Sequence, residues 1–311
     1  MKVWTLHEPV SIKKPVATIG IFDGVHTGHR FILEKLKEQA AMHGGESVVV
    51  TLWPHPRIVL NKDLQQFKLL HSLEEKIRQL EQSGIDHLVI IPFDKEIASL
   101  TACEFTQLYL VDHLGVEVLL VGYDNRFGRD RKGDPDGLAL CADKNDFRIE
   151  KIPEFNQGDG KVSSTSIREA IVLGQMDKAE TMLGYPYYLT GHVVEGNHIG
   201  RKMGFPTANI HPYDPNKQIP LNGVYAIRAE LRNKVYGGML NIGFRPTIDS
   251  ASAVKTIEAH LFDVSGDFYG EKIVVHFIKR VRDEMKFAGL TELKHQLGLD
   301  QIQIQKLLHE N

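Results

Sequence analysis

The sequence predicts an α/β domain followed by a small all-β domain. Its 311 residues exceed what a single hydrophobic core usually serves, so two domains are expected. Apolar runs alternate with helical patterns up to Gly184, and beyond it strand-like runs follow one another between glycine and proline turns. We therefore place an N-terminal domain in residues 1–184 and a C-terminal domain in residues 185–311.

The N-terminal domain is predicted to be Rossmann-like, with a parallel sheet and helical crossovers. Four apolar runs have the buried character of central parallel strands. They are residues 16–21, 47–52, 86–91 and 116–121. Two capping boxes mark helix starts, one formed by Thr101 with Glu104 and the other by Ser166 with Glu169. Ligands of such a sheet bind beyond the carboxyl ends of its strands.

The C-terminal domain is predicted to be a small antiparallel Greek-key β-barrel with a terminal helix. Short β-rich runs are separated by turn residues throughout this part of the chain. They are residues 189–194, 224–232, 235–240, 257–262 and 272–281. Helical periodicity returns after Gly289, over residues 291–308.

The composition indicates an ordinary globular protein, with 42% hydrophobic and 25% charged residues. A net charge of -3 argues against a nucleic-acid partner, and the absence of any apolar run near 18 residues argues against a membrane span. Cys103 and Cys141 are the only cysteines, so we expect neither a disulfide framework nor a cysteine zinc site. We expect a cytoplasmic monomer or weak homo-oligomer.

A glycine-rich stretch, residues 19–29, ends a strand and opens a helix, and it carries His26 and His29. The first turn of a helix presents unpaired N–H groups and the positive end of the helix dipole, which attract phosphate. Two histidines there would add donors for charge developing on a phosphoryl group. The alternative is that the stretch is only a turn.

The motif G-x-F-D-G-V-H-x-G-H in this stretch resembles the bacterial riboflavin kinase/FAD synthetase family and its nucleotidyltransferase superfamily. Three further stretches resemble family motifs: T-L-W-P-H-P, G-Y-D-N-R-F-G and S-S-T-S-I-R. Without the resemblance, the alternative interpretations of these three stretches are, in order, a strand end, a charged loop and a helix cap. The resemblance implies transfer of AMP from ATP to FMN, with release of pyrophosphate. It implies catalytic roles for His26, His29 and Arg168, phosphate binding by Gly20, Phe22, Asp23, Gly24, Gly28, Ser163, Ser164 and Thr165, and flavin binding by Pro54, His55, Asp124, Asn125, Arg126 and Phe127.

Residues 196–209 resemble the riboflavin kinase pattern G-x-x-x-G-R-x-x-G-F-P-T-A-N. They are no Walker P-loop, because G-x-x-x-x-G-K-[ST] occurs nowhere in the chain. The resemblance implies phosphate binding by Gly200, Arg201, Lys202 and Gly204. Thr207 and Asn209 offer the hard oxygen atoms that suit the Mg²⁺ of Mg-ATP.

Two later stretches extend this resemblance. Glu258 matches the general base of the kinase, although a glutamate on an alternating strand is more often an outward-facing polar residue. The stretch R-D-E-M-K-F matches the family's flavin side, which implies flavin contacts from Arg282, Glu284 and Phe287.

Ile21, Trp53 and Asn125 depart from the commonest residues of the family. The resemblance implies a bifunctional enzyme that makes FMN from riboflavin and ATP, and then FAD from FMN and ATP. One alternative is a riboflavin kinase whose N-terminal domain has become a weak or regulatory module. A second is a flavin-binding sensor or RNA-binding regulator, against which the lack of a basic patch with interleaved aromatic residues argues.

Overall fold

The computed structural model describes residues 1–6, 10–60, 67–122, 127–130, 132–145, 147–155, 162–196, 200, 203–245, 254–264 and 266–310. The chain folds as two compact units. The first comprises Met1–Lys68 and Leu73–Val162, and the second comprises Leu69–Ser72 and Ser163–Asn311.

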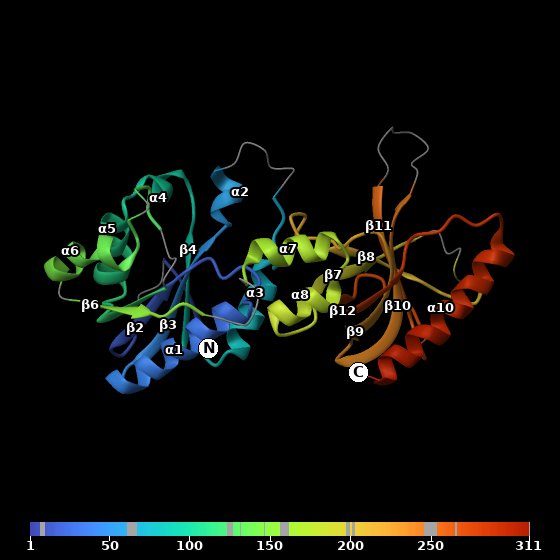
Figure 1. Cartoon of the computed structure of the whole chain (residues 1–311), viewed down its shortest axis with the longest axis horizontal. Helices are drawn as coiled ribbons and strands as arrows, with labels where there is room; N and C mark the ends of the chain where they lie inside the picture. The colour runs from blue at the N-terminus through green and yellow to red at the C-terminus, as the bar shows by residue number, and fades with distance from the viewer. Residues whose placement is uncertain are drawn as a thin grey trace. The chain divides into compact units, whose positions relative to one another are not determined.

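The first unit is built on a six-stranded, fully parallel sheet of strand order β1-β4-β3-β2-β5-β6 (Figure 1). Its strands are β1 (Lys2–Thr5), β2 (Pro15–Ile19), β3 (Glu46–Trp53), β4 (His87–Pro92), β5 (Val118–Gly122) and β6 (Arg148–Ile152). This confirms the predicted parallel sheet and its four central strands. The two edge strands were not predicted, because β1 has four residues and β6 is largely polar.

Helices cover both faces of this sheet, because side chains alternate along each strand. Val49 and Leu88 face a core shared with Leu33 and Leu36 of α1. Val50 belongs to the core on the other face. The helices are α1 (Thr27–His43), α2 (Pro56–Leu60), α3 (Leu73–Gln82), α4 (Lys95–Ser99), α5 (Ala102–Phe105), the π-helix η1 (Thr106–His113) and α6 (Pro135–Asn145). Thr101 and Glu104 form the predicted capping box at α5.

The expectation that the cysteines form no disulfide is wrong. Cys103 of α5 and Cys141 of α6 are joined, with their Cα atoms 5.7 Å apart. The two residues are separated by 38 positions in the sequence, but α5 and α6 pack together on one side of the sheet. That packing brings them within the Cα separation of a disulfide, which sequence spacing alone does not reveal.

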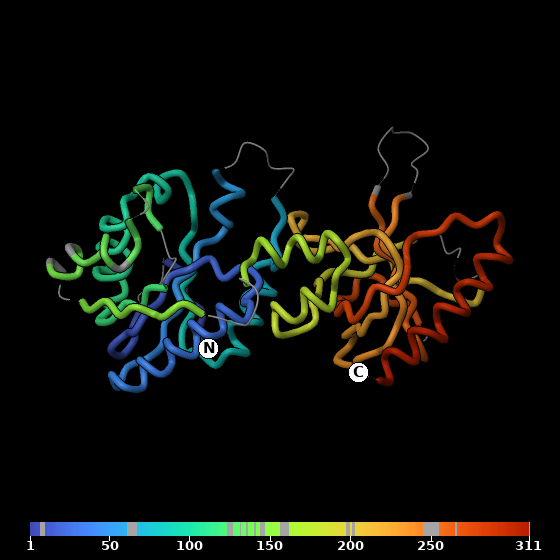
Figure 2. Tube along the Cα trace, in the orientation of Figure 1, coloured from blue at the N-terminus to red at the C-terminus, as the bar shows by residue number. Residues whose placement is uncertain are grey.

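The second unit contains a closed barrel of six strands, all paired antiparallel, in the order β10-β11-β8-β7-β12-β9. Its strands are β7 (Tyr188–Val194), β8 (Ala208–Pro212), β9 (Gly223–Leu231), β10 (Lys234–Arg245), β11 (Val254–Leu261) and β12 (Lys272–Arg282). Three consecutive strands form a meander and β12 returns beside the first of them, which is the Greek-key order. The trace in Figure 2 can be followed through this order. The prediction of an antiparallel barrel is confirmed, and only β8, short and next to Pro206, was missed.

Helix α10 (Leu290–Glu310) packs against β9, β10 and β12, so the predicted terminal helix is confirmed (Figure 1). Ile304 is fully buried against Met239 and Phe262 of the barrel. A bidentate ion pair adds to this apolar contact, because Arg282 at the end of β12 donates to both carboxylate oxygens of Asp300.

Helices α7 (Ser164–Val172) and α8 (Met176–Leu183) lie side by side in the second unit, and α8 packs against β12. The backbone of Leu221 donates to the carbonyl of Ile171, and Lys279 pairs with Asp177 at 3.6 Å.

The predicted cap at Ser166 is wrong. Ser163 caps α7, and its side chain accepts from the amide of Ser166 at 3.2 Å, so the helix starts three residues earlier. The hydroxyl of Ser166, at the third helical position, accepts from the backbone amide of Ser163. In the usual capping box a glutamate side chain at that position accepts from the same amide.

We predict that a fragment of residues 163–311 is more stable than one of residues 187–311. The shorter fragment loses α7 and α8, and with them the contact of α8 with β12 and the buried side chains of Leu183 and Ile171. Burial of two such side chains contributes about 3 kcal/mol or more. A melting temperature about 5–10 °C lower is expected for the shorter fragment. Thermal unfolding of both fragments measures this, and equal melting temperatures would contradict it.

Candidate functional site

The histidines of the glycine-rich stretch lie where the sequence predicts them, at the start of α1. His26 is the N-cap residue, and its Nδ1 atom accepts from the backbone amide of His29 at 3.3 Å. The two rings stack with their centroids 3.7 Å apart and 15° between their planes. Because Nδ1 of His26 accepts, the proton of the neutral ring lies on Nε2. The cap therefore fixes both imidazoles at the anion-attracting end of a helix.

The turn before α1 has an unusual backbone. Phe22 and Val25 have φ values of 50° and 37°, in the left-handed region that non-glycine residues seldom adopt. Gly24, between them, has a φ of 92° and meets no such penalty. Asp23 lies within this turn and is only 3% exposed. Such a conformation persists only where the surrounding structure holds it.

Lys76 of α3, which was not predicted as a site residue, is only 1% exposed. Its ammonium group donates to Thr51 Oγ1 at 3.5 Å and lies 5.1 Å from the centroid of the Trp53 ring. Burial lowers the pKa of Lys76 to about 8, while the charge of Asp23 acts in the opposite direction. The available signal was its position four residues before Leu80, on the buried face of α3.

The other residues predicted for this domain are only partly described. His55 is buried after β3 and accepts from the amide of Arg57 at 3.0 Å, with its ring 4.6 Å from that of Phe67. Phe127 packs against Phe105, with their ring centroids 5.6 Å apart. Pro54 follows Trp53 through a cis peptide bond. Asp124, Asn125 and Arg126 lie outside the described residues.

The predicted phosphate residues of the S-S-T-S-I-R stretch lie in the second unit, at the N-terminus of α7. Ser163 is the cap, Ser164 and Thr165 are in the first turn, and Arg168 is half-buried one turn later. These residues thus lie at the N-terminus of α7, a nine-residue helix whose positive dipole end attracts anions.

In the barrel, a cavity of about 390 Å³ brings together predicted residues from separate motifs. Strand pairing places Glu258 opposite Asn209 on one side and opposite Asn241 on the other. Directly paired residues project on the same face of a sheet, so these three side chains form a row across β8, β11 and β10. Thr207, two residues before Asn209, lines the same cavity. Asn241 is the member of the row that sequence analysis did not single out as a site residue.

The predicted flavin residues Arg282, Glu284 and Phe287 line the same cavity. The guanidinium of Arg282 is held by Asp300 at 2.7–3.1 Å, and Asp300 is only 2% exposed. Arg282 therefore anchors α10 in addition to lining the cavity. Asp300 was not predicted as a site residue, because an aspartate within a helical pattern usually lies at the surface.

Gly200 also lines the cavity, and it is a position where the backbone approaches closely. A Cβ atom there would lie 2.2 Å from the carbonyl oxygen of Phe205. The amide of Phe205 also donates to the carbonyl of Gly200 at 2.9 Å, closing a tight loop before Thr207. Gly204, in the same loop, has a φ of 86°. Arg201 and Lys202 lie outside the described residues.

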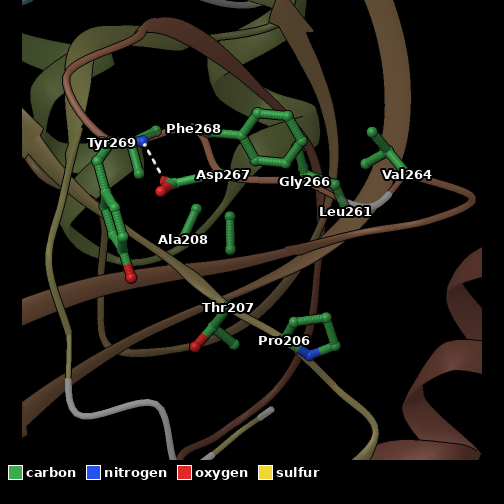
Figure 3. A pocket seen from close by; sticks show the side chains of 11 residues that line it. Pro206, Thr207, Ala208, Leu261, Val264, Gly266, Asp267, Phe268 and Tyr269 are labelled. Carbon is green, nitrogen blue, oxygen red and sulfur yellow. Dashed lines mark hydrogen bonds between the residues drawn. The ribbon is translucent and has the colours of Figure 1, made fainter.

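A second cavity, of about 260 Å³, shares Thr207 with the first. In Figure 3, Asp267, Phe268 and Tyr269 lie on one side of it, with Thr207 and Pro206 on the other. Asp267 accepts from the amide of Tyr269 at 3.1 Å, which orders this loop. Thr207 therefore lines two cavities, one with several apolar side chains and one with the aromatic rings of Phe268 and Tyr269.

No cluster of three or more His, Cys, Asp or Glu side chains suited to a metal occurs in the part of the chain that the structure describes. Thr207 and Asn209 instead offer neutral oxygen atoms beside Glu258. None of the described helices combines the length and the apolar character that a membrane crossing requires.

Two family models divide the chain between them. Residues 9–166 match the FAD synthetase family, and residues 183–308 match the riboflavin kinase family. Curated relatives named bifunctional riboflavin kinase/FMN adenylyltransferase match along most of the chain. This chain belongs to the bifunctional riboflavin kinase/FMN adenylyltransferase family.

The relatives of this family cover a wide range of bacteria. The Bacillus subtilis protein is 37% identical, and the Escherichia coli K12 protein 39% identical, each over 92% of this chain and 90% of its own length. The Listeria monocytogenes protein is 34% identical over 97% of this chain and 96% of its own. The crystal structure of a macrolide-efflux protein from Streptococcus pneumoniae superposes with a TM-score of 0.86 at 31% identity, covering 96% of this chain and 97% of its own. This similarity shows that the parallel-sheet fold and the barrel fold also occur together in the chain of that Streptococcus pneumoniae protein.

We predict that Asp300→Ala destabilises the riboflavin kinase part of this family member. The variant leaves the Arg282 guanidinium without its carboxylate, and loss of one partner of a buried ion pair costs about 3–5 kcal/mol. The matched control is the double variant Arg282→Met with Asp300→Leu, which removes both charges and should recover most of that loss. Denaturant unfolding measures the difference. A single variant as stable as the parent would show that the ion pair does not anchor α10.

Proposed function

We propose that this chain phosphorylates riboflavin to FMN in its barrel and adenylates FMN to FAD in its N-terminal domain, over residues 185–311 and 1–184 respectively. Both activities are those of the family to which the chain belongs. The observation that carries the proposal is the row of Asn209, Glu258 and Asn241 in a cavity that apolar side chains also line. A cytoplasmic location fits these small-molecule substrates.

Glu258 is proposed as the general base of the kinase. It is half-buried on β11, and the pairing with Asn209 and Asn241 fixes its direction. A ribityl hydroxyl is a poor nucleophile, so a positioned carboxylate assists by accepting its proton as the new bond to the γ-phosphorus forms. The bond that breaks joins the γ-phosphorus to the bridging oxygen of ADP, which leaves with the electron pair.

Thr207 stands where the flavin hydroxyl and the γ-phosphate would meet, since it lines both cavities. The apolar side chains that line the larger cavity, among them Phe287 and Met239, suit a flavin ring, and Glu284 and Arg282 line the same cavity. The tight loop at Gly200 and Gly204 presents backbone to the ATP phosphates. Arg201 and Lys202 are proposed as additional phosphate contacts from the sequence pattern.

The donor set at this junction suits Mg²⁺. Thr207 and Asn209 project on the same side of the chain, two residues apart, and present oxygen atoms beside the Glu258 carboxylate. Mg²⁺ prefers oxygen ligands and retains waters and phosphate oxygens in its shell, so a few protein oxygens suffice. When bound, it neutralises charge developing on the transferred phosphoryl group.

His26 and His29 are proposed to stabilise adenylyl transfer. One phosphate oxygen of FMN attacks the α-phosphorus of ATP, a new P–O bond forms, and the bond to pyrophosphate breaks. Negative charge grows on the α-phosphate oxygens in the transition state, where the two imidazoles and the first turn of α1 offer donors. Ser163, Ser164, Thr165 and Arg168 are proposed to hold the leaving pyrophosphate. Pro54, His55 and residues 124–127 are proposed to bind FMN.

One incubation tests the proposal as a whole. Purified protein is supplied with riboflavin and Mg-ATP, and the flavins are resolved by chromatography. Formation of FMN followed by FAD is expected. FMN without FAD would indicate a kinase with a weak or regulatory N-terminal domain, and the absence of both products would overturn the proposal.

We predict that Glu258→Gln lowers the rate of FMN formation by about 10²–10⁴-fold. The change keeps the shape of the side chain and removes its basicity, so riboflavin and ATP should bind nearly as before. Thr207→Ala is the comparison, since it should instead raise the KM for Mg-ATP. Steady-state kinetics with riboflavin measure both variants, and FAD formation from supplied FMN is the internal control. A parent rate in Glu258→Gln at every pH would remove Glu258 as the base.

We predict that His29→Ala lowers kcat for FAD formation by about 10²-fold, the scale of one lost transition-state donor. The KM values should change less, because the contact strengthens only as charge develops. FMN formation by the same sample should stay at the parent rate, which controls for folding. An unchanged FAD rate would show that the histidine stretch is only a turn.

A further inference from the structure

A single loop of the barrel, residues 266–269, makes one wall of the smaller cavity. Its side chains Asp267, Phe268 and Tyr269 lie across the cavity from Thr207 (Figure 3). Aromatic rings in a cavity wall suit a flat ring such as a nucleobase. The proposed kinase reaction puts the flavin in the larger cavity, which leaves the smaller one for the nucleoside of ATP.

The two ends of this loop are set by the backbone. After the loop, the amide of Gly270 donates to the carbonyl of Val193 in β7 at 2.9 Å, which ties that end to the barrel. At the other end Gly266 has a φ of 148°, and the preceding strand β11 has already ended at Leu261. The part of the loop that carries the rings therefore depends on side-chain contacts for its position.

Arg232, in the turn between β9 and β10, makes such contacts. Its Nη2 atom donates to the carbonyl oxygen of Asp267 at 3.1 Å, and its guanidinium carbon lies 5.2 Å from the centroid of the Phe268 ring. Nε and Nη2 also donate to Oε1 of Glu271, at 3.2 and 2.8 Å. One guanidinium thus contacts a backbone carbonyl, an aromatic ring and a carboxylate along the loop.

The backbone of Arg232 is unusual for an arginine. Arg232 and Asn233 form a two-residue turn, because Leu231 pairs with Lys234 on either side of it. Their φ values of 50° and 61° are the left-handed values that such a turn requires, and an arginine adopts them only at a cost. Leu231 also pairs with Ile273, which brings the turn to the start of β12. A glycine would fit this turn with less strain, so the arginine side chain needs a reason to be there.

We propose that Arg232 is a positioning residue for riboflavin phosphorylation, which fixes the loop of residues 266–269 so that its aromatic rings hold the nucleoside of ATP. The inference rests on the proposed kinase activity of the barrel. Arg232 acts through Asp267 and Phe268, which line the cavity. Because the side chains of Arg232 and Glu271 are 53% and 38% exposed, the contacts are modest, and we expect an effect of about five- to tenfold on ATP binding.

The test follows FMN formation by the full chain with Arg232→Met, which keeps the length of the side chain and removes its donors. The KM for ATP should rise about five- to tenfold, while kcat and the KM for riboflavin stay within about twofold of the parent values. Arg232→Lys should not restore the KM, because an ammonium group lacks the planar fork that stacks on a ring. A parent KM for ATP in Arg232→Met would overturn the proposal.

Adenosine, used as a competitive inhibitor against ATP, distinguishes the loop from a direct phosphate contact. It carries the base and the ribose without phosphate, so Arg232→Met should raise its inhibition constant by the same factor as the KM for ATP. An unchanged inhibition constant beside a raised KM would show that Arg232 contacts phosphate directly. Restoration of the KM by Arg232→Lys would show that only its charge matters. Either result would overturn the proposal.

Phe268→Leu tests whether Arg232 acts through the loop. It removes the ring and should itself raise the KM for ATP, and adding Arg232→Met should raise the KM by less than the product of the two separate effects. Effects that multiply fully would contradict the proposed coupling.

Lys234→Met is the matched control, since Lys234 is an exposed cation directly after the same turn. It should keep the parent KM for ATP, and a rise equal to that of Arg232→Met would attribute the effect to the charge of the turn and overturn the proposal. A parent that makes no FMN would overturn the proposed function and this inference with it. A parent that makes FMN, with a KM for ATP that Arg232→Met leaves unchanged, would overturn the inference alone.

Discussion

The register of the closed barrel is the constraint on which the kinase site depends. Pairing of β8, β11 and β10 sets Asn209, Glu258 and Asn241 in one row, and closure of the barrel leaves those strands no free edge. A slip of one residue would turn each of these side chains to the opposite face. Arg282 and Asp300 tie α10 to the end of β12, and Leu293 and Leu297 of α10 line the same cavity as the row.

The N-terminal unit meets a different constraint at the carboxyl ends of its parallel strands. The chain must turn sharply from β2 into α1 and keep backbone groups available for phosphate. It does so with a strained turn and a histidine cap, and it buries Asp23 in that turn and the hydroxyl of Thr51 against the carbonyl of Ile21 before it. Polar groups buried in this way must be paired, which makes the region specific in structure and sensitive to single substitutions.

Much of the site could be predicted from the sequence, because its residues lie in short local motifs. The glycine-rich turn and the helix start after it follow from spacing that acts within one turn of chain, whereas the cap at His26 was not predicted. Thr207 and Asn209, two residues apart, share a side for the same local reason. The start of α7 was misplaced because two serine hydroxyls replaced the expected glutamate.

The sequence by itself determined the two fold classes, the main strands and the local motifs, because hydrophobic periodicity and turn chemistry depend on neighbours along the chain. Only the tertiary structure decided which motifs meet. It paired Cys103 with Cys141, placed Asp300 on Arg282 and buried Lys76 of α3 against Thr51 of β3. These contacts join residues of different elements, and periodicity says which face of an element is buried but not what it is buried against.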